Sequence, residues 1–320
     1  MSSAVCLLVY SALVSVMTPR LLPRVTAGGR APAFAVAVWL AALTSVLASW
    51  MAAAVALIAD AIRIWHKPDS SLLGTCFAVL RSVLSGNDGS AARLAVIVLT
   101  STLSGFVAVL GFRVLRSVAR TRVTSTRHAR SVQIIGRRVQ GVDGLVIDVP
   151  EKAVYSVAGR HRTVVITTAA LAVLEKSHLD AVLAHERAHL TGRHHLILAA
   201  TRALAGALPR VKLFTVAETE VARLLEMCAD DRAAQDHGKP AVLGAILSLA
   251  GAVPIPRGAL GAATVSISAR VVRLAAPANT VRRVRSLIQL TAFGVVVAST
   301  PVLALSGAAH GAVMCLPFTS

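Results

Sequence analysis

The chain has 320 residues, of which 55% are hydrophobic and only 15% charged, and its formal net charge is +18. Soluble globular proteins carry about 25% charged residues, so this composition excludes an ordinary soluble domain as the whole chain. The positive charge alone would fit a nucleic-acid-binding protein. Aromatic residues, however, make up only 4% of the chain, and most of the basic excess adjoins hydrophobic stretches. We therefore expect a protein of the lipid bilayer that does not bind nucleic acid directly.

Four stretches without charged residues are candidates to cross a bilayer as helices. They cover residues 2–18, 33–59, 94–112 and 287–307. The first stretch lacks the basic start and the cleavage site of a signal peptide, so we expect it to remain as an anchor. The sequence thus predicts three parts: a membrane region with three spans (1–112), a domain (113–286), and a fourth span with a short tail (287–320).

Basic residues predict the orientation, because Lys and Arg stay on the cytoplasmic side. They gather between the first two spans, after the third and before the fourth, whereas acidic residues balance them between the second and third. We expect a multi-pass protein of the plasma membrane with a cytoplasmic domain and external N- and C-termini. Cys76 and Cys315 then both lie outside, where a disulfide between them is allowed.

Three short runs rich in Val and Ile open the predicted cytoplasmic domain. They are Leu145–Val149, Ala153–Val157 and Thr163–Thr167, and turn residues separate them. We expect a small antiparallel sheet in an α+β fold that is otherwise mainly helical. The basic turn formed by Arg160, His161 and Arg162 is a candidate electrostatic site for an acidic segment of a substrate.

His185, Glu186 and His189 form the motif H-E-x-x-H in a predicted helix. Residues four apart share a helical face, so the two imidazoles converge on a point where one Zn²⁺ can bind. Glu186 then lies beside the water on the metal, where a general base is needed. His194 and His195 follow a break in this helix and fall off the ligand face. We interpret them as structural residues or outer partners of the site rather than ligands.

A second predicted helix, over residues 217–237, carries the candidate third ligand. Glu226 and Asp230 are four residues apart and share a face. The Glu226 carboxylate completes a His₂Glu site that leaves a fourth position for water, and Asp230 can accept the N–H of a ligating histidine. An exposed acidic face is the alternative. It is disfavoured because three of only 15 acidic residues in the chain, Glu226, Asp230 and Asp231, lie together in this one part of the helix.

The stretches AVLAHERAHLTGRHHL and LLEMCADDRAA resemble the BlaR/MecR-type membrane zinc metallopeptidases, which are gluzincins whose founding members sense β-lactams. Related CAAX-protease and HtpX-type enzymes carry a second glutamate where this chain has Cys228, which favours the BlaR/MecR-type branch. The resemblance implies a zincin-like fold with these roles: zinc ligands His185, His189 and Glu226, catalytic base Glu186, and supporting residue Asp230.

The resemblance also implies an edge strand that pairs with an extended substrate. The candidate residues are Val164, Val165, Ile166 and Thr167, although a sheet that only supports the zinc helix fits the pattern equally well. The β-lactam receptors carry an extracellular penicillin-binding domain after the fourth span, whereas only residues 308–320 follow it here. We therefore expect the trigger to come from a separate sensor protein or from the spans.

The function implied by the resemblance is that of a signalling protease whose protein substrate is a cytoplasmic repressor of the winged-helix type. Two alternatives stay open. One is housekeeping cleavage of misfolded membrane proteins, as in HtpX-type enzymes. The other is a non-proteolytic membrane transducer with a structural zinc, which Glu186 disfavours because a structural site has no use for a general base.

Overall fold

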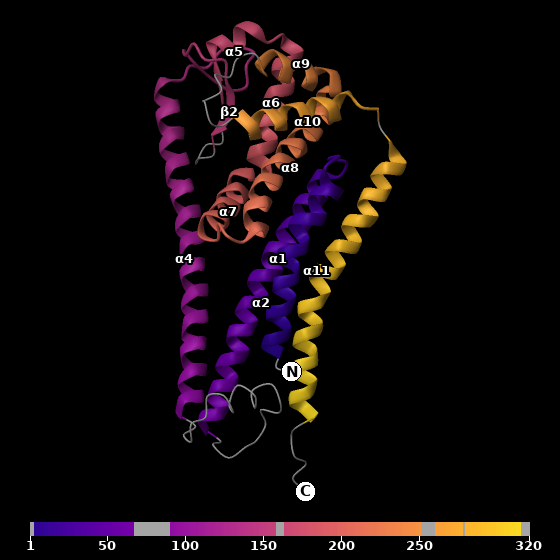
Figure 1. Cartoon of the computed structure of the whole chain (residues 1–320). Helices are drawn as coiled ribbons and strands as arrows, with labels where there is room; N and C mark the ends of the chain where they lie inside the picture. The colour runs from indigo at the N-terminus through magenta and orange to yellow at the C-terminus, as the bar shows by residue number, and fades with distance from the viewer. Residues whose placement is uncertain (1–2, 67–89, 158–162, 251–259, 278, 315–320) are drawn as a thin grey trace. The chain divides into compact units, whose positions relative to one another are not determined.

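The computed structural model describes residues 3–66, 90–157, 163–250, 260–277 and 279–314, and this part is mainly helical with one small sheet (Figure 1). Three helical segments are long and apolar enough to cross a membrane: Ala4–Thr26, Pro32–Ile58 and Ser101–Ile135. They belong to α1 (Ser3–Thr26), α2 (Pro32–His66) and α4 (Ser90–Ile135). The first three predicted spans thus fall in long apolar helices.

The fourth predicted span, 287–307, lies in α11 (Thr280–Met314), which is not among these segments within the described residues. The number of crossings and the orientation of the chain stay predictions. The chain divides into two compact units. One comprises Met1–Leu21, Leu40–Arg113 and Thr291–Ser320, and the other comprises Leu22–Trp39 and Val114–Leu290.

In the first unit, α1, α2 and α11 meet at one backbone carbonyl. Tyr10 Oη donates to Val297 O at 2.6 Å, and Ser45 Oγ donates to the same oxygen at 3.1 Å. In a regular helix this carbonyl would accept from the N–H of residue 301, but Pro301 has none. The two hydroxyls therefore supply the hydrogen bonds that the helix itself cannot give to this carbonyl. An unpaired carbonyl away from water is energetically costly.

The sheet of the second unit contains β1 (Leu145–Ile147), β2 (Val154–Val157) and β3 (Thr163–Thr167), in the order β1-β3-β2. β3 is antiparallel to β2 but parallel to β1. The sheet is therefore mixed, and the prediction of an antiparallel sheet is wrong for β1. β3 takes the centre of the sheet, and Val164–Thr167 are all buried, as expected of a strand with partners on both edges and helices on both faces.

The central position of β3 also overturns the predicted role of that strand. A strand paired on both edges has no free backbone groups for a substrate, so the assignment of Val164, Val165, Ile166 and Thr167 as the substrate strand is wrong. Their side chains are all buried. Thr167 instead caps α5 (Thr168–Val173), because its side chain accepts a hydrogen bond from Ala170 N at 3.2 Å.

Helices cover both faces of the sheet. Val164 and Ile166 pack with Leu183 of α6 (Lys176–Thr191), whereas Val165 points the other way, toward Val132 of α4. This alternation follows from the two-residue period of a strand. The apolar side of α6 is thereby fixed on the sheet, and its opposite side is left for the helices that follow.

Helix α8 (Lys212–His237) contacts α6 and the remaining helices of this unit (Figure 1). These are α7 (His194–Ala207), α9 (Lys239–Ala250) and α10 (Leu260–Ala275). Small side chains line the contact between α6 and α8, where Ala181 and Ala184 pack with Ala233. Small residues let the two backbones approach closely, so polar side chains of α8 can reach those of α6.

The turn between α1 and α2 lies against α8 in the same unit. Arg273 Nη1 donates to Gly29 O at 3.3 Å, and Arg223 Nη2 donates to Thr26 O at 3.1 Å. Gly29 has a left-handed backbone with φ +53°, and a Cβ there would lie 2.3 Å from Met227 Sδ. Both facts require glycine at this position. The turn is thus seated beside the residue that follows Glu226.

Candidate metal centre

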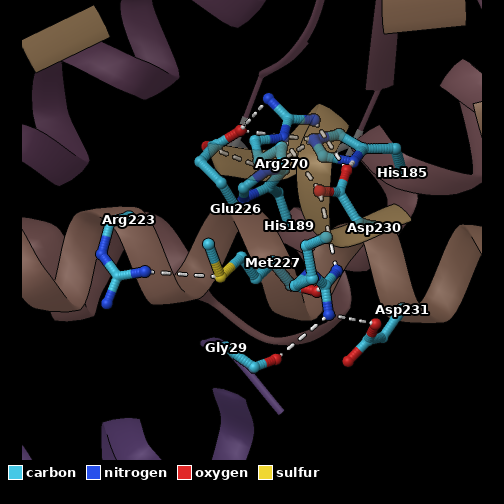
Figure 2. Close-up of polar contacts among 10 residues, drawn as sticks. Gly29, His185, His189, Arg223, Glu226, Met227, Asp230, Asp231 and Arg270 are labelled. Carbon is cyan, nitrogen blue, oxygen red and sulfur yellow. Dashed lines mark hydrogen bonds and ion pairs between the residues drawn. The ribbon is translucent and has the colours of Figure 1, made fainter. Parts of the chain in front are cut away.

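The two histidines of the H-E-x-x-H motif lie on the side of α6 that faces α8 (Figure 2). His185 Nε2 and His189 Nε2 are 3.1 Å apart, and their ring centroids are separated by 4.8 Å. One helical turn separates the two residues, so both rings project into the same small volume. The structure therefore brings the two predicted nitrogen ligands together.

Glu226 of α8 adds an oxygen donor to this pair. Its Oε2 is 3.6 Å from His185 Nε2, and its Oε1 is 3.4 Å from His189 Nε2. Zinc bonds of 2.0–2.1 Å in a tetrahedron hold neighbouring ligand atoms about 3.3 Å apart, so the three donors fit one ion. Among the described residues, these three form the one group of His, Cys, Asp or Glu side chains close enough to share a metal.

Asp230 holds the far side of the first histidine. Its Oδ1 is 3.1 Å from His185 Nδ1, and its side chain is fully buried. A carboxylate that accepts from Nδ1–H fixes the tautomer in which Nε2 keeps its lone pair, as a metal ligand requires. Glu226 and Asp230 thus act on the same ring from two sides because they lie one turn apart on α8.

His194 holds the far side of the second histidine. Its Nδ1 is 2.8 Å from His189 Nδ1, and its ring is buried. The approach depends on the turn between α6 and α7, where Arg193 adopts a left-handed backbone with φ 52°. A Cβ at Gly192 would lie 2.4 Å from His194 Nε2, so glycine leaves room for the ring. His194 is a neighbour of the donor group and not a member of it.

Burial, hydrogen bonds and charges in the centre together shift the pKa of each donor. Burial lowers the pKa of His185, but hydrogen bonds to Asp230 and Glu226 outweigh it and raise this pKa to about 9. Burial lowers the pKa of His189 to about 4. For Glu226, burial opposes ionisation, yet the two histidines and Arg270 hold its pKa below the usual range. These shifts favour an ionised Glu226 beside a protonated His185 and a neutral His189.

Glu186, the predicted base, is close to the donors but not one of them. It follows His185 on α6 and accepts hydrogen bonds from the side chain and backbone of Ser156 in β2. Burial raises its pKa, which the His185 charge and the Ser156 hydrogen bonds only partly oppose. A carboxylate with a raised pKa is a stronger base than an ordinary glutamate, as a general base requires.

The edge of the sheet beside the centre is β2, not β3. Thr167 N donates to Ala153 O at 3.0 Å, so Ala153 and alternate residues after it pair with β3. In an antiparallel ladder the N–H and C=O of the residues between them, Val154 and Ser156, then point away from β3. No described strand pairs with this outer edge. The Ser156 N–H on this edge donates to Glu186, so the groups that an extended peptide can join are the N–H and C=O of Val154 and the C=O of Ser156.

Arg270 of α10 completes the centre, and the sequence did not single it out. Its Nε and Nη2 donate to the two oxygens of Asp230 at 2.9 and 2.7 Å, and its Nη1 donates to Glu226 Oε2 at 3.0 Å (Figure 2). In the sequence it is one of several arginines before the predicted fourth span, all of which the orientation rule already explains. One feature of the sequence could have indicated that Arg270 faces the protein interior: it lies three residues after Ile267 and four before Leu274, on the same helical face.

Two other predictions lie outside the described residues: the disulfide between Cys76 and Cys315, and the basic turn at 160–162. The remaining cysteines, Cys6 and Cys228, are free. Burial raises the pKa of the Cys228 thiol to about 11, so this side chain stays protonated and unreactive near neutral pH.

Comparison with known families agrees with this geometry. Residues 145–253 match the profile of peptidase family M48, a stretch that runs from β1 past α9 and includes all the predicted catalytic and ligand residues. The match supports a metallopeptidase of the zincin type. Searches of curated proteins and of solved structures gave no significant match. Arg270 and the turn at Gly29 lie outside the matched stretch.

Proposed function

We propose that the chain is a membrane-bound zinc metalloendopeptidase. The observation that carries the proposal is the placement of Glu186 beside the three donors His185, His189 and Glu226. Structural zinc sites use four protein ligands, whereas catalytic sites use three and keep one position open. Three donors with an adjacent buried carboxylate fit the catalytic kind. The long apolar helices support a place in the membrane.

Each group of the centre has a separate role in peptide hydrolysis. Zinc, when bound by the two histidines and Glu226, would polarise the scissile carbonyl and acidify a water molecule. Glu186 takes the proton from the attacking water and later gives it to the leaving amine. The outer edge of β2 holds the peptide in an extended form through the backbone N–H and C=O of Val154 and the C=O of Ser156.

Within this activity, we assign the chain to BlaR/MecR-type signalling proteases that cleave a cytoplasmic repressor of the winged-helix type. The sequence stretches around His185 and Glu226 support this subtype, as does Cys228 in place of a second glutamate. The stimulus would come from a separate sensor protein or from the spans. The peptidase unit then lies in the cytoplasm, with the chain termini outside.

The proposal is tested by comparing new protein N-termini in cells that express the wild type or Glu186→Gln, with and without cell-wall stress. Glu218→Gln, on the partly exposed side of α8, is the matched control because it also removes one carboxylate. We expect Glu186→Gln to retain zinc and to lose one or a few cleavage sites, among them a site in a DNA-binding repressor. Glu218→Gln should keep them all.

Other outcomes point to the two alternatives. A loss of many cleavage sites across membrane proteins would replace signalling with quality control. Equal N-termini in all strains, with zinc-loaded and folded protein, would contradict proteolysis and favour a transducer with a structural metal.

A further inference from the structure

The strongest feature that the proposed mechanism does not use is the side chain that reaches the metal centre from α10. Arg270 is nearly buried, with 13% of its side chain exposed, and it contacts both acidic residues of the centre. Burying a guanidinium is costly unless its donors are satisfied. Here Nε, Nη1 and Nη2 all donate to carboxylate oxygens, so the group is built into the site.

The contact with Asp230 fixes the orientation of that carboxylate. Paired hydrogen bonds from a planar guanidinium hold both the position and the plane of a carboxylate, which a single donor cannot do. The oxygen that receives Nη2 of Arg270 at 2.7 Å is Oδ1, the same atom that lies 3.1 Å from His185 Nδ1. Arg270 therefore acts on His185 through Asp230, and it leaves His185 Nε2 directed at the other donors.

The contact with Glu226 selects one of its two oxygens. Arg270 Nη1 donates to Oε2, whereas Oε1 lies 3.4 Å from His189 Nε2. Arg270 thus uses a lone pair of Oε2 as a hydrogen-bond acceptor, and the lone pairs of Oε1 stay available to a metal ion. Its positive charge also offsets the repulsion between Glu226 and Asp230, two carboxylates one turn apart on α8.

We infer that Arg270 is a positioning residue of the metal centre, which orients His185 through Asp230 and holds Glu226 by one oxygen. The inference rests on the proposed zinc site. The charge of Arg270 acts in the opposite direction, because a cation beside a ligand repels a metal ion. We expect the positioning effect to exceed this repulsion. Replacing Arg270 removes at once the three hydrogen bonds that hold the carboxylates of Asp230 and Glu226 in place.

The test is a measurement of zinc affinity on the full-length protein in detergent, stripped of metal and titrated in competition with a chromophoric chelator. Replacing an outer partner of a zinc ligand weakens binding about 10–100-fold, and we expect this loss for Arg270→Gln. Arg270→Lys should recover only part of the affinity, because one ammonium cannot reproduce the guanidinium fork.

Arg273→Gln is the matched control. Arg273 lies one turn further along α10, is equally buried with 14% of its side chain exposed, and also bonds to α8. It donates hydrogen bonds to Asp231 and to the backbone oxygens of Met227 and Gly29, none of which is a candidate ligand, and its Nη2 lies 3.8 Å from Asp230 Oδ2, too far for a hydrogen bond. We expect this variant to bind zinc as the wild type does, and to keep the absorption bands of the Co²⁺-substituted protein, which Arg270→Gln shifts.

A double-mutant cycle separates positioning from a general loss of stability. Asp230→Asn combined with Arg270→Gln replaces a buried charge pair with two neutral amides, so no unpaired carboxylate remains at position 230. If Arg270 acts through Asp230, the double variant loses less zinc affinity than the sum of the single variants. The same cycle between Asp230→Asn and Arg273→Gln should show a much smaller coupling, because these two side chains share only a 3.8 Å ion pair.

Unchanged or tighter zinc binding in Arg270→Gln would overturn the inference, as would additivity between Asp230→Asn and Arg270→Gln. A wild-type protein that binds zinc tightly but cleaves no protein would defeat the proposed function alone, because the affinity comparison does not depend on cleavage. A wild-type protein that binds no zinc would overturn both.

Discussion

His194 Nδ1 lies 2.8 Å from Nδ1 of His189, although the two residues belong to different helices. Together with the contact between His185 and Asp230, this pairing gives each candidate histidine ligand its own partner on the nitrogen that does not face the metal. The two partners differ in kind, since one is a buried carboxylate and the other a neutral imidazole. Metal binding should therefore respond to changes at the turn that joins α6 to α7, although this turn supplies no ligand atom.

The first prediction concerns the glycine that makes room for His194. Gly192→Ala would place a Cβ 2.4 Å from His194 Nε2, so the ring must move away from His189. We expect the protein to lose zinc to a chelator about 10-fold more readily, as does His194→Ala. Metal content after dialysis against the chelator, measured by elemental analysis, checks this. Arg193→Gly, which accepts the left-handed backbone of the same turn, should retain its metal.

The second prediction concerns the proton on His185. Its pKa of about 9 in the metal-free protein lies above the ordinary 6.5, so the protonated form stabilises the folded state. This stabilisation is complete below pH 6.5 and is lost as the pH rises through 9. Zinc must displace the proton, so binding at pH 7.5 should release about one proton from His185. Calorimetry in buffers of different ionisation enthalpy measures the release. Asp230→Asn should release fewer protons, and equal release would contradict the assignment.

The third prediction concerns the outer edge of β2. Val154→Pro removes an N–H that points away from β3, so it should leave the β2–β3 ladder intact and weaken substrate pairing. One lost hydrogen bond costs about 0.5–1.5 kcal/mol, which corresponds to a fall in kcat/KM of about 2- to 10-fold. Val154→Ala keeps the N–H and serves as the control. Cleavage by Val154→Pro at the rate of Val154→Ala would rule out this edge as the peptide site.

The fourth prediction concerns the carbonyl at which three helices of the first unit meet. Tyr10→Phe removes one of the two hydroxyls that bond Val297 O, and we expect a loss of about 1–3 kcal/mol in stability. Pro301→Ala restores the missing backbone N–H, so the cost of Tyr10→Phe should shrink in that background. Thermal unfolding in detergent measures both. An equal cost in the two backgrounds would show that the hydroxyl has another role.

Local rules account for what the sequence predicted well. The spacing of His185 and His189, and of Glu226 and Asp230, depends only on the period of a helix, and the structure places each pair on one face. The three strands follow from runs of Val and Ile, and their positions lie within two residues of those predicted. Such features are set by neighbours in sequence, where side-chain patterns carry most of the information.

Contacts between distant segments account for what the sequence missed. The order of the three strands depends on which strand is buried on both faces, so β3 could not be distinguished from an edge by its own residues. Arg270 is 40 residues from Asp230, and its role depends on how α10 packs on α8. The contact of His194 depends on a left-handed arginine that no propensity favours.

The family match ends at residue 253, whereas the arginine that holds both acidic residues of the centre is at position 270. A fragment cut at the limits of the match would keep every donor atom of the metal centre. It would lack Arg270, however, so Asp230 would lose its positively charged partner. It would also lack the turn at Gly29, which an N-terminal segment supplies to the outer side of α8. The smallest piece able to reproduce the centre is therefore discontinuous in sequence, and truncation studies on this chain should begin from α10 rather than from the boundaries of similarity.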